Sequence, residues 1–302
     1  MQVLTDDQRV CVLTVKSEIM RSAGTYLRQQ GFIEILPVIL SPITDPLHHE
    51  TYGGSIDYYG QPYQLTKSMI LHKQISLRTV PRIFCFSPNV RMEPAQRAPL
   101  GRYLAEFVQL DLEVRDATRD GIMNIGEGLF VAILQGVVDN CSRELDALHR
   151  RLTIPKTPFE RITYHDAQQQ FGKAFDDALS ESLSEPTWVI DFPREVREFY
   201  DREDPARPDT LLDMDLVYPE GYGEALSGGE REYVLSRIRR RIEQDKLDPQ
   251  RFRQYLDAVK DGIVPSAGFG IGVERLTRYV CGLDSVGDAR LFAKLPGMVG
   301  SI

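Results

Sequence analysis

Charged side chains that could bind a phosphorylated ligand are concentrated between residues 82 and 115, in RIFCFSPNVRMEPAQRAPLGRYLAEFVQLDLEVR. Two segments of this stretch alternate polar and apolar residues, which predicts two strands joined by a loop. The alternation places Arg91 and Glu93 on the polar side of the first strand, and Asp111 and Glu113 on that of the second. A half-buried sheet with a solvated face would show the same pattern. Charges inside a sheet are costly unless they are paired or liganded, so we expect the floor of a site for a charged ligand.

A second candidate for anion binding is the segment 264–282, VPSAGFGIGVERLTRYVCG. It predicts a strand that ends at a glycine cluster and turns into a helix. Glycines let a ligand approach the backbone closely, and the start of a helix leaves N–H groups free for anions. Arg275, one turn into the helix, could face the same ligand or could be an ordinary surface charge. The spacing is GxGxG rather than GxGxxG and lies near the C-terminus, so a dinucleotide site is not expected.

Further carboxylates follow in LLDMDLVY at 211–218, which alternates as a strand and carries Asp215. A glycine-rich turn, PEGYGEALSGGERE, comes next and is flanked by Glu224 and Arg231. Arginines bind phosphates and carboxylates by forked hydrogen bonds. Carboxylates on neighbouring strands suit hard cations such as magnesium. Combined with the hairpin and the glycine cluster, these residues predict a site for a nucleoside triphosphate with Mg²⁺.

The other periodic segments must form the scaffold that positions these residues. They predict an amphipathic helix at 5–30, a strand at 31–40 broken by Pro37, a strand and a helix within 61–80, a long helix at 120–150, a strand at 187–193, and helices at 231–245 and 249–260. Residues 41–60 are expected to be a loop, and 151–186 show no clear period. We therefore expect an α+β fold, an antiparallel β-sheet flanked by helices, in one domain over 1–302. The broken strand could be core or a dimer seam.

Composition restricts the function classes. The 302 residues carry a net charge of −8, with 42% hydrophobic and 26% charged residues, as in a globular enzyme-sized fold. An acidic chain is a poor general binder of nucleic acid. We expect no membrane association, because no apolar run approaches the roughly 20 residues of a span and the N-terminus lacks a signal-peptide layout. Four widely spaced cysteines indicate the reducing cytoplasm, and the adjacent histidines at 48 and 49 do not suit a metal site.

Three segments resemble the motifs of one enzyme family. Residues 91–107, RMEPAQRAPLGRYLAEF, resemble motif 2 of class II aminoacyl-tRNA synthetases, and 268–275, GFGIGVER, resemble their motif 3. GFIEILPVIL at 31–40 resembles motif 1, with the proline one position early. EFVQLDLE, KSMILHKQ and EALSGGER are similar to the aspartyl and asparaginyl branch. The resemblance implies the catalytic-domain fold of class II synthetases.

Motif 1 begins near residue 31, so we expect no anticodon-binding domain. In this respect the chain most resembles the archaeal asparagine synthetase-related proteins. The resemblance implies an ATP-dependent ligase that activates aspartate as aspartyl-adenylate and passes it to ammonia, giving asparagine, AMP and pyrophosphate. The second hypothesis is the same activation with transfer to tRNA or another acceptor. The third hypothesis is a non-catalytic binding module. The partners expected are aspartate, ATP, ammonia and a second copy of the chain in a homodimer. We do not expect tRNA, because phosphate contacts dominate RNA affinity and this chain is acidic.

The resemblance also implies roles at matching positions. The ATP-binding residues would be Arg91 at the α-phosphate, Arg275 at the γ-phosphate and adenine, Phe107 stacked on adenine, and Glu93 and Arg102, with Arg91 and Arg275 catalytic. The magnesium ligands would be Asp215 and Glu224. The residues at the substrate's side-chain carboxylate would be Lys73 and Arg231, and those near its α-ammonium would be Ser68 and Asp111.

Three positions depart from the family pattern. Tyr103 replaces a motif 2 histidine, Ile70 replaces a glutamine, and Tyr52 replaces a loop glutamate, for which the nearby Glu50 is a possible substitute. Two of these changes fall at the amino-acid end of the expected pocket. Aspartate and asparagine as substrates, and the carboxylate that is activated, therefore stay open from sequence.

Overall fold

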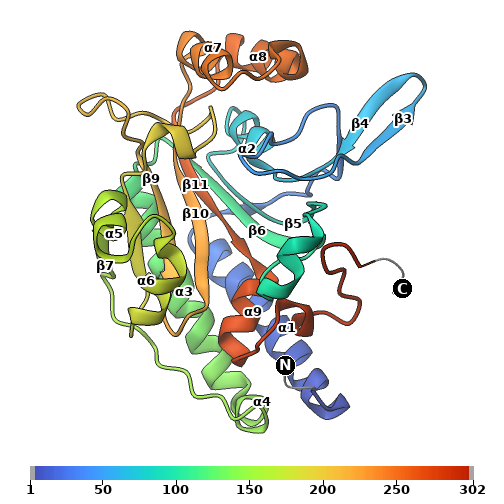
Figure 1. The fold of residues 1–302 in the computed structure, drawn as a ribbon, viewed down its shortest axis with the longest axis vertical. Coiled ribbons are helices and arrows are strands. Elements are labelled where there is room, and N and C mark those ends of the chain that lie inside the picture. The colour runs from blue at the N-terminus through green and yellow to red at the C-terminus, as the bar shows by residue number, and fades with distance from the viewer. Residues whose placement is uncertain (1–3, 299–302) are drawn as a thin grey trace.

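A large, mostly antiparallel sheet forms the centre of the molecule (Figure 1). The structure is a computed structural model that describes residues 4–298. The sheet has eight strands in the order β1 (Ile33–Glu34), β5 (Arg82–Val90), β6 (Glu106–Arg115), β11 (Ser266–Gly272), β10 (Gly223–Arg231), β9 (Asp213–Tyr218), β8 (Thr187–Ile190) and β7 (Glu160–Thr163). Only the outermost pairs, β1 with β5 and β7 with β8, are parallel. The expected α+β architecture is confirmed.

The predicted hairpin forms the second and third strands of this sheet. Strands β5 and β6 pair antiparallel with Cys85 opposite Asp111, and β6 then pairs with β11. The loop between them contains the 3-10 helix η1 (Ala95–Leu100). Because β11 lies beside β6, the glycine cluster and the carboxylates of the hairpin meet in space (Figure 1).

Three helices carry the apolar residues that cover one face of the sheet. These are α1 (Asp6–Gln29), α3 (Arg119–Asn140) and α9 (Val273–Cys281), whose side chains join β5, β6, β9, β10 and β11 in the main core. Thr5 caps α1 in a capping box with Gln8. Of the helices that the structure describes, α3 alone has the length and composition of a membrane span, but it packs in this core. The helix predicted at 120–150 is broken at Cys141, after which α4 (Ser142–Ala147) begins.

Two smaller units flank the sheet. Helices α5 (Tyr164–Phe171) and α6 (Phe175–Ser182) cover the β7–β8 edge with a core of their own, in the segment that showed no clear period. Another core is shared by helices α2 (Ile70–Ser76), α7 (Leu235–Gln244) and α8 (Arg253–Lys260). The 3-10 helix η3 (Pro249–Phe252) lies directly before α8. The unit around α2 matters for function, because it brings Lys73 against β6.

Three expectations were wrong in detail. Of the glycine-rich segment expected as a turn after β9, residues 219–222 do form a turn, but the rest is strand β10, whose glycines allow close packing against β9 and β11. Part of the expected loop at 41–60 is β3 (Ser55–Tyr58), which pairs with β4 (Gln61–Leu65) and β2 (Leu40–Ser41) in a small sheet. The strand at 31–40 is reduced to two short pieces on either side of Pro37.

Candidate active site

Two adjoining cavities lie on the polar face of the sheet. The first, of about 280 Å³, is lined by four arginines (Arg91, Arg97, Arg102 and Arg275), and we call it the arginine cavity. The second, of about 190 Å³, is lined by Lys73 and Arg231, and we call it the lysine cavity. Their common wall consists of His49, Arg91, Gln109, Glu224 and Gly270. One ligand that bridges the common wall could therefore reach both cavities.

The two arginines predicted to be catalytic line the same cavity, as expected. Arg91 follows the end of β5, where its Nε donates to the carbonyl of Lys67 at 3.0 Å and its guanidinium lies 5.2 Å from the Phe107 ring centroid. The Nε of Arg275, in α9, donates to the carbonyl of Arg102 at 3.2 Å. Arg91 has no carboxylate partner among residues 4–298, whereas Arg275 also lies 3.3 Å from Glu224, so it is the charge of Arg91 that stays available for an anion.

Tyr103 is the centre of a cluster of guanidiniums in the arginine cavity. Its ring centroid lies 5.0 Å from the Cζ of Arg97, 5.8 Å from that of Arg102 and 5.5 Å from that of Arg275. Arg102 also forms an ion pair with Asp177 of α6. The departure from histidine at this position thus gives an aromatic face that holds three cations close to one another.

Glu93, expected at the ATP site, lines the arginine cavity, but its carboxylate already has two partners. His49 Nε2 lies 3.0 Å from Oε1, and Arg97 Nη1 donates to Oε2 at 2.9 Å. Glu93 therefore acts on the cavity through the residues it holds. His49 and Arg97 were not predicted; the spacing of four residues between Glu93 and Arg97 is the one signal in the sequence that indicates their pairing.

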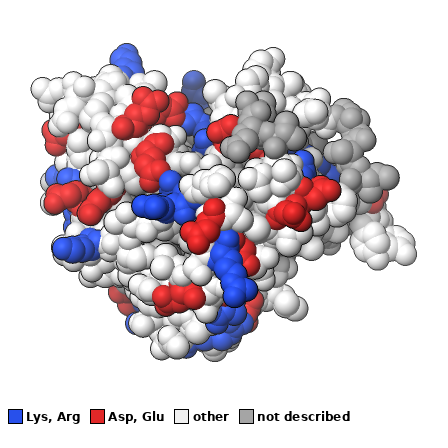
Figure 2. All heavy atoms as spheres, turned by 90° about the horizontal axis from the view of Figure 1, so that it is seen from below, with Lys and Arg blue, Asp and Glu red and all other residues white. Residues whose placement is uncertain are grey.

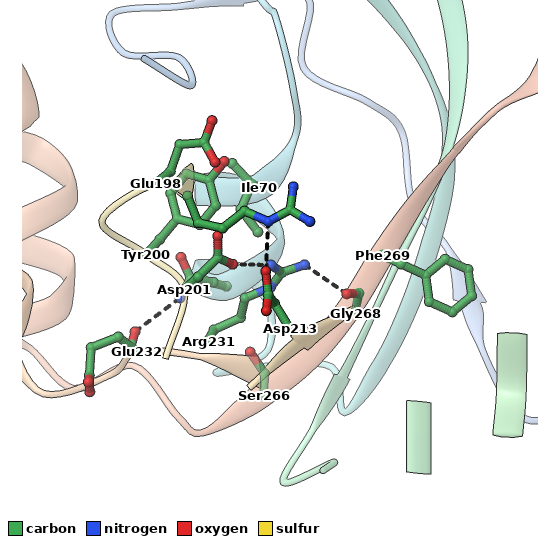
Figure 3. A network of polar contacts seen from close by, with 12 residues as sticks. Ile70, Glu198, Tyr200, Asp201, Asp213, Arg231, Glu232, Ser266, Gly268 and Phe269 are labelled. Atoms are coloured by element: carbon green, nitrogen blue, oxygen red, sulfur yellow. Dashed lines mark hydrogen bonds and ion pairs between the residues drawn. The ribbon is translucent and has the colours of Figure 1, made fainter. Parts of the chain in front are cut away.

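Buried ion pairs form the lysine cavity. Lys73 Nζ, on α2, donates to Asp111 Oδ1 at 2.8 Å and lies 3.6 Å from Glu113 Oε2. Arg231, on β10, donates through Nη1 to Asp201 at 2.8 Å (Figure 3). Its Nε donates to Glu113 at 3.1 Å. Both cations expected at the substrate's side chain are thus in one cavity.

The depth of this cavity changes the acidity of its carboxyl groups. Burial raises the pKa of Asp201 to about 6, although Arg231 beside it acts in the opposite direction. Burial also raises the pKa of Asp111 despite its contact with Lys73. Desolvation therefore outweighs pairing, so the cavity stabilises a ligand that supplies charges of both signs.

Asp215 and Glu224, the expected magnesium ligands, lie together on β9 and β10 and line a common hollow. Asp215 Oδ2 pairs with Arg197 Nη2 at 2.8 Å, whereas its buried Oδ1 has no hydrogen-bond partner among residues 4–298. Burial, and then the charge of Glu224, raise the pKa of Asp215 to about 7. A free carboxylate oxygen beside a second carboxylate fits Mg²⁺, which commonly takes one or two protein carboxylates and completes its shell with phosphates and water.

The remaining predicted residues divide between cavity and surface. Ser68 lines the lysine cavity, where its hydroxyl accepts a hydrogen bond from the Ile70 N–H at 3.2 Å. Glu50 is exposed and does not belong to the lining of either cavity. The bridge from Tyr52 to Met92 ties this loop to the end of β5 and leaves His49, rather than Glu50, on the common wall.

Three carboxylates of the lysine cavity were missed in the sequence: Asp45, Glu198 and Asp201. Asp45 lies in the loop after β2, and Glu198 follows the 3-10 helix η2 (Arg194–Val196). In neither segment do polar and apolar residues alternate regularly, so the sequence does not distinguish a residue that lines a cavity from one that faces solvent. Comparison of the cavity walls, rather than sequence spacing, identifies them.

Comparisons with known proteins agree with this geometry. Residues 2–296 match the family model described as tRNA synthetases class II (D, K and N). The chain is 30% identical to the asparagine–tRNA ligase of Pelotomaculum thermopropionicum over 94% of this chain and 69% of that protein. It is 31% identical to that of Desulforamulus reducens over 91% and 67%.

Solved structures give the same relationship. The asparaginyl-tRNA synthetase of Pyrococcus horikoshii, complexed with asparaginyl-adenylate, superposes with a TM-score of 0.87 at 27% identity, covering 97% of this chain and 70% of that one. The aspartyl-tRNA synthetase of Entamoeba histolytica, at 20% identity and a TM-score of 0.80, shares the fold. The chain therefore belongs to the class II tRNA synthetase family, in the aspartyl and asparaginyl branch.

Proposed function

We propose that this protein uses ATP to convert an amino acid of the aspartate–asparagine pair into its aminoacyl-adenylate. The observation that carries the proposal is the common wall between the arginine cavity and the lysine cavity. The first offers four partly exposed arginines to a triphosphate, and the second offers buried, paired charges to a small zwitterion. Arg91 lies on the common wall, where the carboxylate and the α-phosphate would meet.

The reaction requires charge neutralisation and alignment more than acid–base catalysis. A carboxylate oxygen of the amino acid forms a bond to the α-phosphorus, and the bond from that phosphorus to the bridging oxygen of pyrophosphate breaks. Arg91 would hold the α-phosphate, while Arg275 would hold the end of the triphosphate that leaves. Bound Mg²⁺, held by Asp215 and Glu224, would neutralise phosphate charge.

Aspartate is the substrate that the lysine cavity favours. Lys73 and Arg231 place two buried cations where a side-chain carboxylate can lie, and a neutral amide would use only their hydrogen bonds. Asparagine is the second candidate, because the curated relatives are named asparagine–tRNA ligases.

Pyrophosphate exchange distinguishes these substrates. We expect radiolabelled pyrophosphate to enter ATP when aspartate and magnesium are present, and much less with asparagine. A preference for asparagine would reverse the choice of substrate, and exchange with neither would refute the activation itself. Chelation of magnesium by EDTA should stop the exchange, and added magnesium should restore it.

The acceptor that we propose is tRNA. The expectation of asparagine synthesis from ammonia receives no support from the relatives, which are named tRNA ligases. The expectation that tRNA is not a partner is likewise unsupported. On the face drawn in Figure 2, acidic and basic side chains are interspersed, so RNA would depend on local contacts there. Purified adenylate-forming protein should transfer labelled amino acid to tRNA; labelled asparagine formed with ammonium instead would restore the ammonia hypothesis.

We further propose that two copies pair through the segment around Pro37. Leu36 is 91% exposed, and Ile33, Ile39 and Leu40 are also exposed beside it. Apolar side chains gathered on a sheet edge commonly mark an interface between proteins. Light scattering should give a dimer for the wild-type protein and a monomer for Leu36→Asp; a wild-type monomer at micromolar concentration would contradict this proposal.

A further inference from the structure

We propose that Asp45 and Glu198 form the subsite that binds the ammonium group of the amino acid. The inference rests on the proposed function and extends it to two residues that the family motifs do not contain. Both side chains line the lysine cavity. They come from separate loops, after β2 and after η2, that hydrogen bonds tie together. The His48 N–H donates to Glu198 Oε1 at 3.2 Å, and the Tyr200 hydroxyl donates to Asp45 Oδ2 at 3.1 Å.

The charges of the lysine cavity are unequally matched. Asp111 pairs with Lys73, and Asp201 pairs with Arg231. Within residues 4–298, by contrast, neither Asp45 nor Glu198 forms an ion pair, although the side chain of Asp45 is buried. Asp45 and Glu198 thus line the cavity without a cationic side-chain partner, and an ammonium group of a ligand would supply one.

A second observation points to a ligand at the same place. The Oδ2 of Asp111 is buried and has no hydrogen-bond partner among the described residues, and Asp111 lines the same cavity. Buried carboxylate oxygens without donors are uncommon in folded proteins. An ammonium group has three N–H donors, which suits Asp45, Glu198 and this oxygen of Asp111 together.

The surroundings of Glu198 support a cationic ligand rather than a neutral one. Burial and the charges of Asp45 and Asp201 raise the pKa of Glu198 to about 8, and Arg197 opposes them only in part. Glu198 lies beside Ile70 and Tyr200 in Figure 3. Because the side chain of Ile70 is apolar, the ammonium contacts must come from other residues of the cavity, and Glu198 and Asp45 are placed to supply them.

A double-mutant cycle between protein and substrate tests this assignment. The variants are Glu198→Gln and Asp45→Asn, and the ligand pair is the substrate and its analogue without the amino group: succinate for aspartate, or succinamate for asparagine. Pyrophosphate exchange gives kcat/KM for the substrate, and inhibition of exchange gives the affinity of the analogue. We expect each variant to raise the KM of the amino acid by about 10- to 100-fold, the range for a lost hydrogen bond to a charged group.

The affinity of the analogue and the KM of ATP should change less than threefold, because neither ligand has an ammonium group. A purely structural role would weaken substrate and analogue equally, so the cycle separates the two explanations. Glu195→Gln is the matched control, since Glu195 is exposed in the same segment and outside both cavities.

The outcomes are distinguishable. If the wild type exchanges pyrophosphate and both variants keep its KM for the amino acid, the ammonium subsite is wrong and the proposed function stands. If the wild type neither exchanges pyrophosphate nor binds the amino acid in calorimetry, both are wrong. Should one variant fail to fold, the other still decides, because each carboxylate comes from a different loop.

Discussion

The arginine cavity and the lysine cavity differ in how their cationic side chains are held and in how deeply those side chains are buried. In the arginine cavity, Arg91 and Arg275 donate to backbone carbonyls, and Tyr103 supports three guanidiniums through its ring. In the lysine cavity, Lys73 and Arg231 are buried and each contacts carboxylates.

The difference indicates what each cavity can accept. Partly exposed guanidiniums attract a mobile polyanion and are solvated again when it leaves. Buried pairs are part of the fold and accept only a ligand that keeps their charges balanced. The contrast is weakest at Glu224, which lies 3.3 Å from Arg275 and belongs to the common wall.

The largest effect should follow from breaking a buried pair. Arg231→Ala leaves Asp201 without its cation and Glu113 with Lys73 alone, which typically costs about 3–5 kcal/mol of the free energy of unfolding. Urea denaturation measures this loss. Arg275→Ala, in the arginine cavity, should change stability by less than about 1 kcal/mol, as for exposed ion pairs. Equal losses in the two variants would remove the distinction between the cavities.

The next largest effect should be a loss of catalytic rate with little change in stability. Arg91→Ala should raise the barrier to adenylate formation by about 2–4 kcal/mol, the scale of a lost transition-state donor. Rapid-quench measurement of adenylate gives the rate, and the melting temperature should stay close to that of the wild type, because the Arg91 side chain donates its hydrogen bond to one backbone carbonyl. Arg78→Ala serves as control for an exposed arginine. A rate within twofold of wild type would show that Arg91 has another role.

These two cavities were not equally accessible from sequence. The period of two in β6 placed Asp111 and Glu113 on one face, and the glycine cluster marked the junction of β11 and α9. The hairpin, the glycine-rich junction, Arg91 and Arg275 therefore followed from local patterns. Asp45, His49 and Glu198 lie in loops whose course depends on tertiary contacts, and no period marks them.

The glycines show a similar limit. We expected the cluster at 268–272 to admit a ligand, and Gly270 and Gly272 do line the arginine cavity. Glycine is required at position 268 by close packing instead, because a side chain there would overlap Glu113 and the backbone of Leu112. Sequence alone could not separate close packing from ligand access.

A smaller effect is expected on ATP binding when the aromatic ring of the arginine cavity is removed. Tyr103→Leu removes the ring that holds Arg97, Arg102 and Arg275, and should weaken ATP by about 1–2 kcal/mol in total, as for several partly exposed cation–π contacts. The KM of ATP in pyrophosphate exchange measures this change. Tyr103→Phe keeps the ring and should behave as wild type; a defect of the same size in Tyr103→Phe would assign the effect to the hydroxyl.

The smallest effect is a pH dependence of the lysine cavity. The pKa of Glu198 is raised to about 8, so its carboxyl group is mostly neutral at pH 7 and ionises as the pH rises. An ammonium group binds the ionised form, so the KM of the amino acid should fall several-fold, roughly, between pH 7 and 8.5. The profile should be flat in Glu198→Gln. A KM that rises over this range in the wild type would contradict the sign.

If the two cavities are halves of one site, a stable sulfamoyl analogue of the aminoacyl-adenylate should occupy both, and calorimetry measures its binding. One molecule should bind with a single site per chain, at least about 100-fold more tightly than AMP or the amino acid alone, since it joins both halves. Both Arg275→Ala and Lys73→Met should weaken it. An analogue that binds no more tightly than AMP, and is indifferent to Lys73→Met, would show that the cavities do not work together.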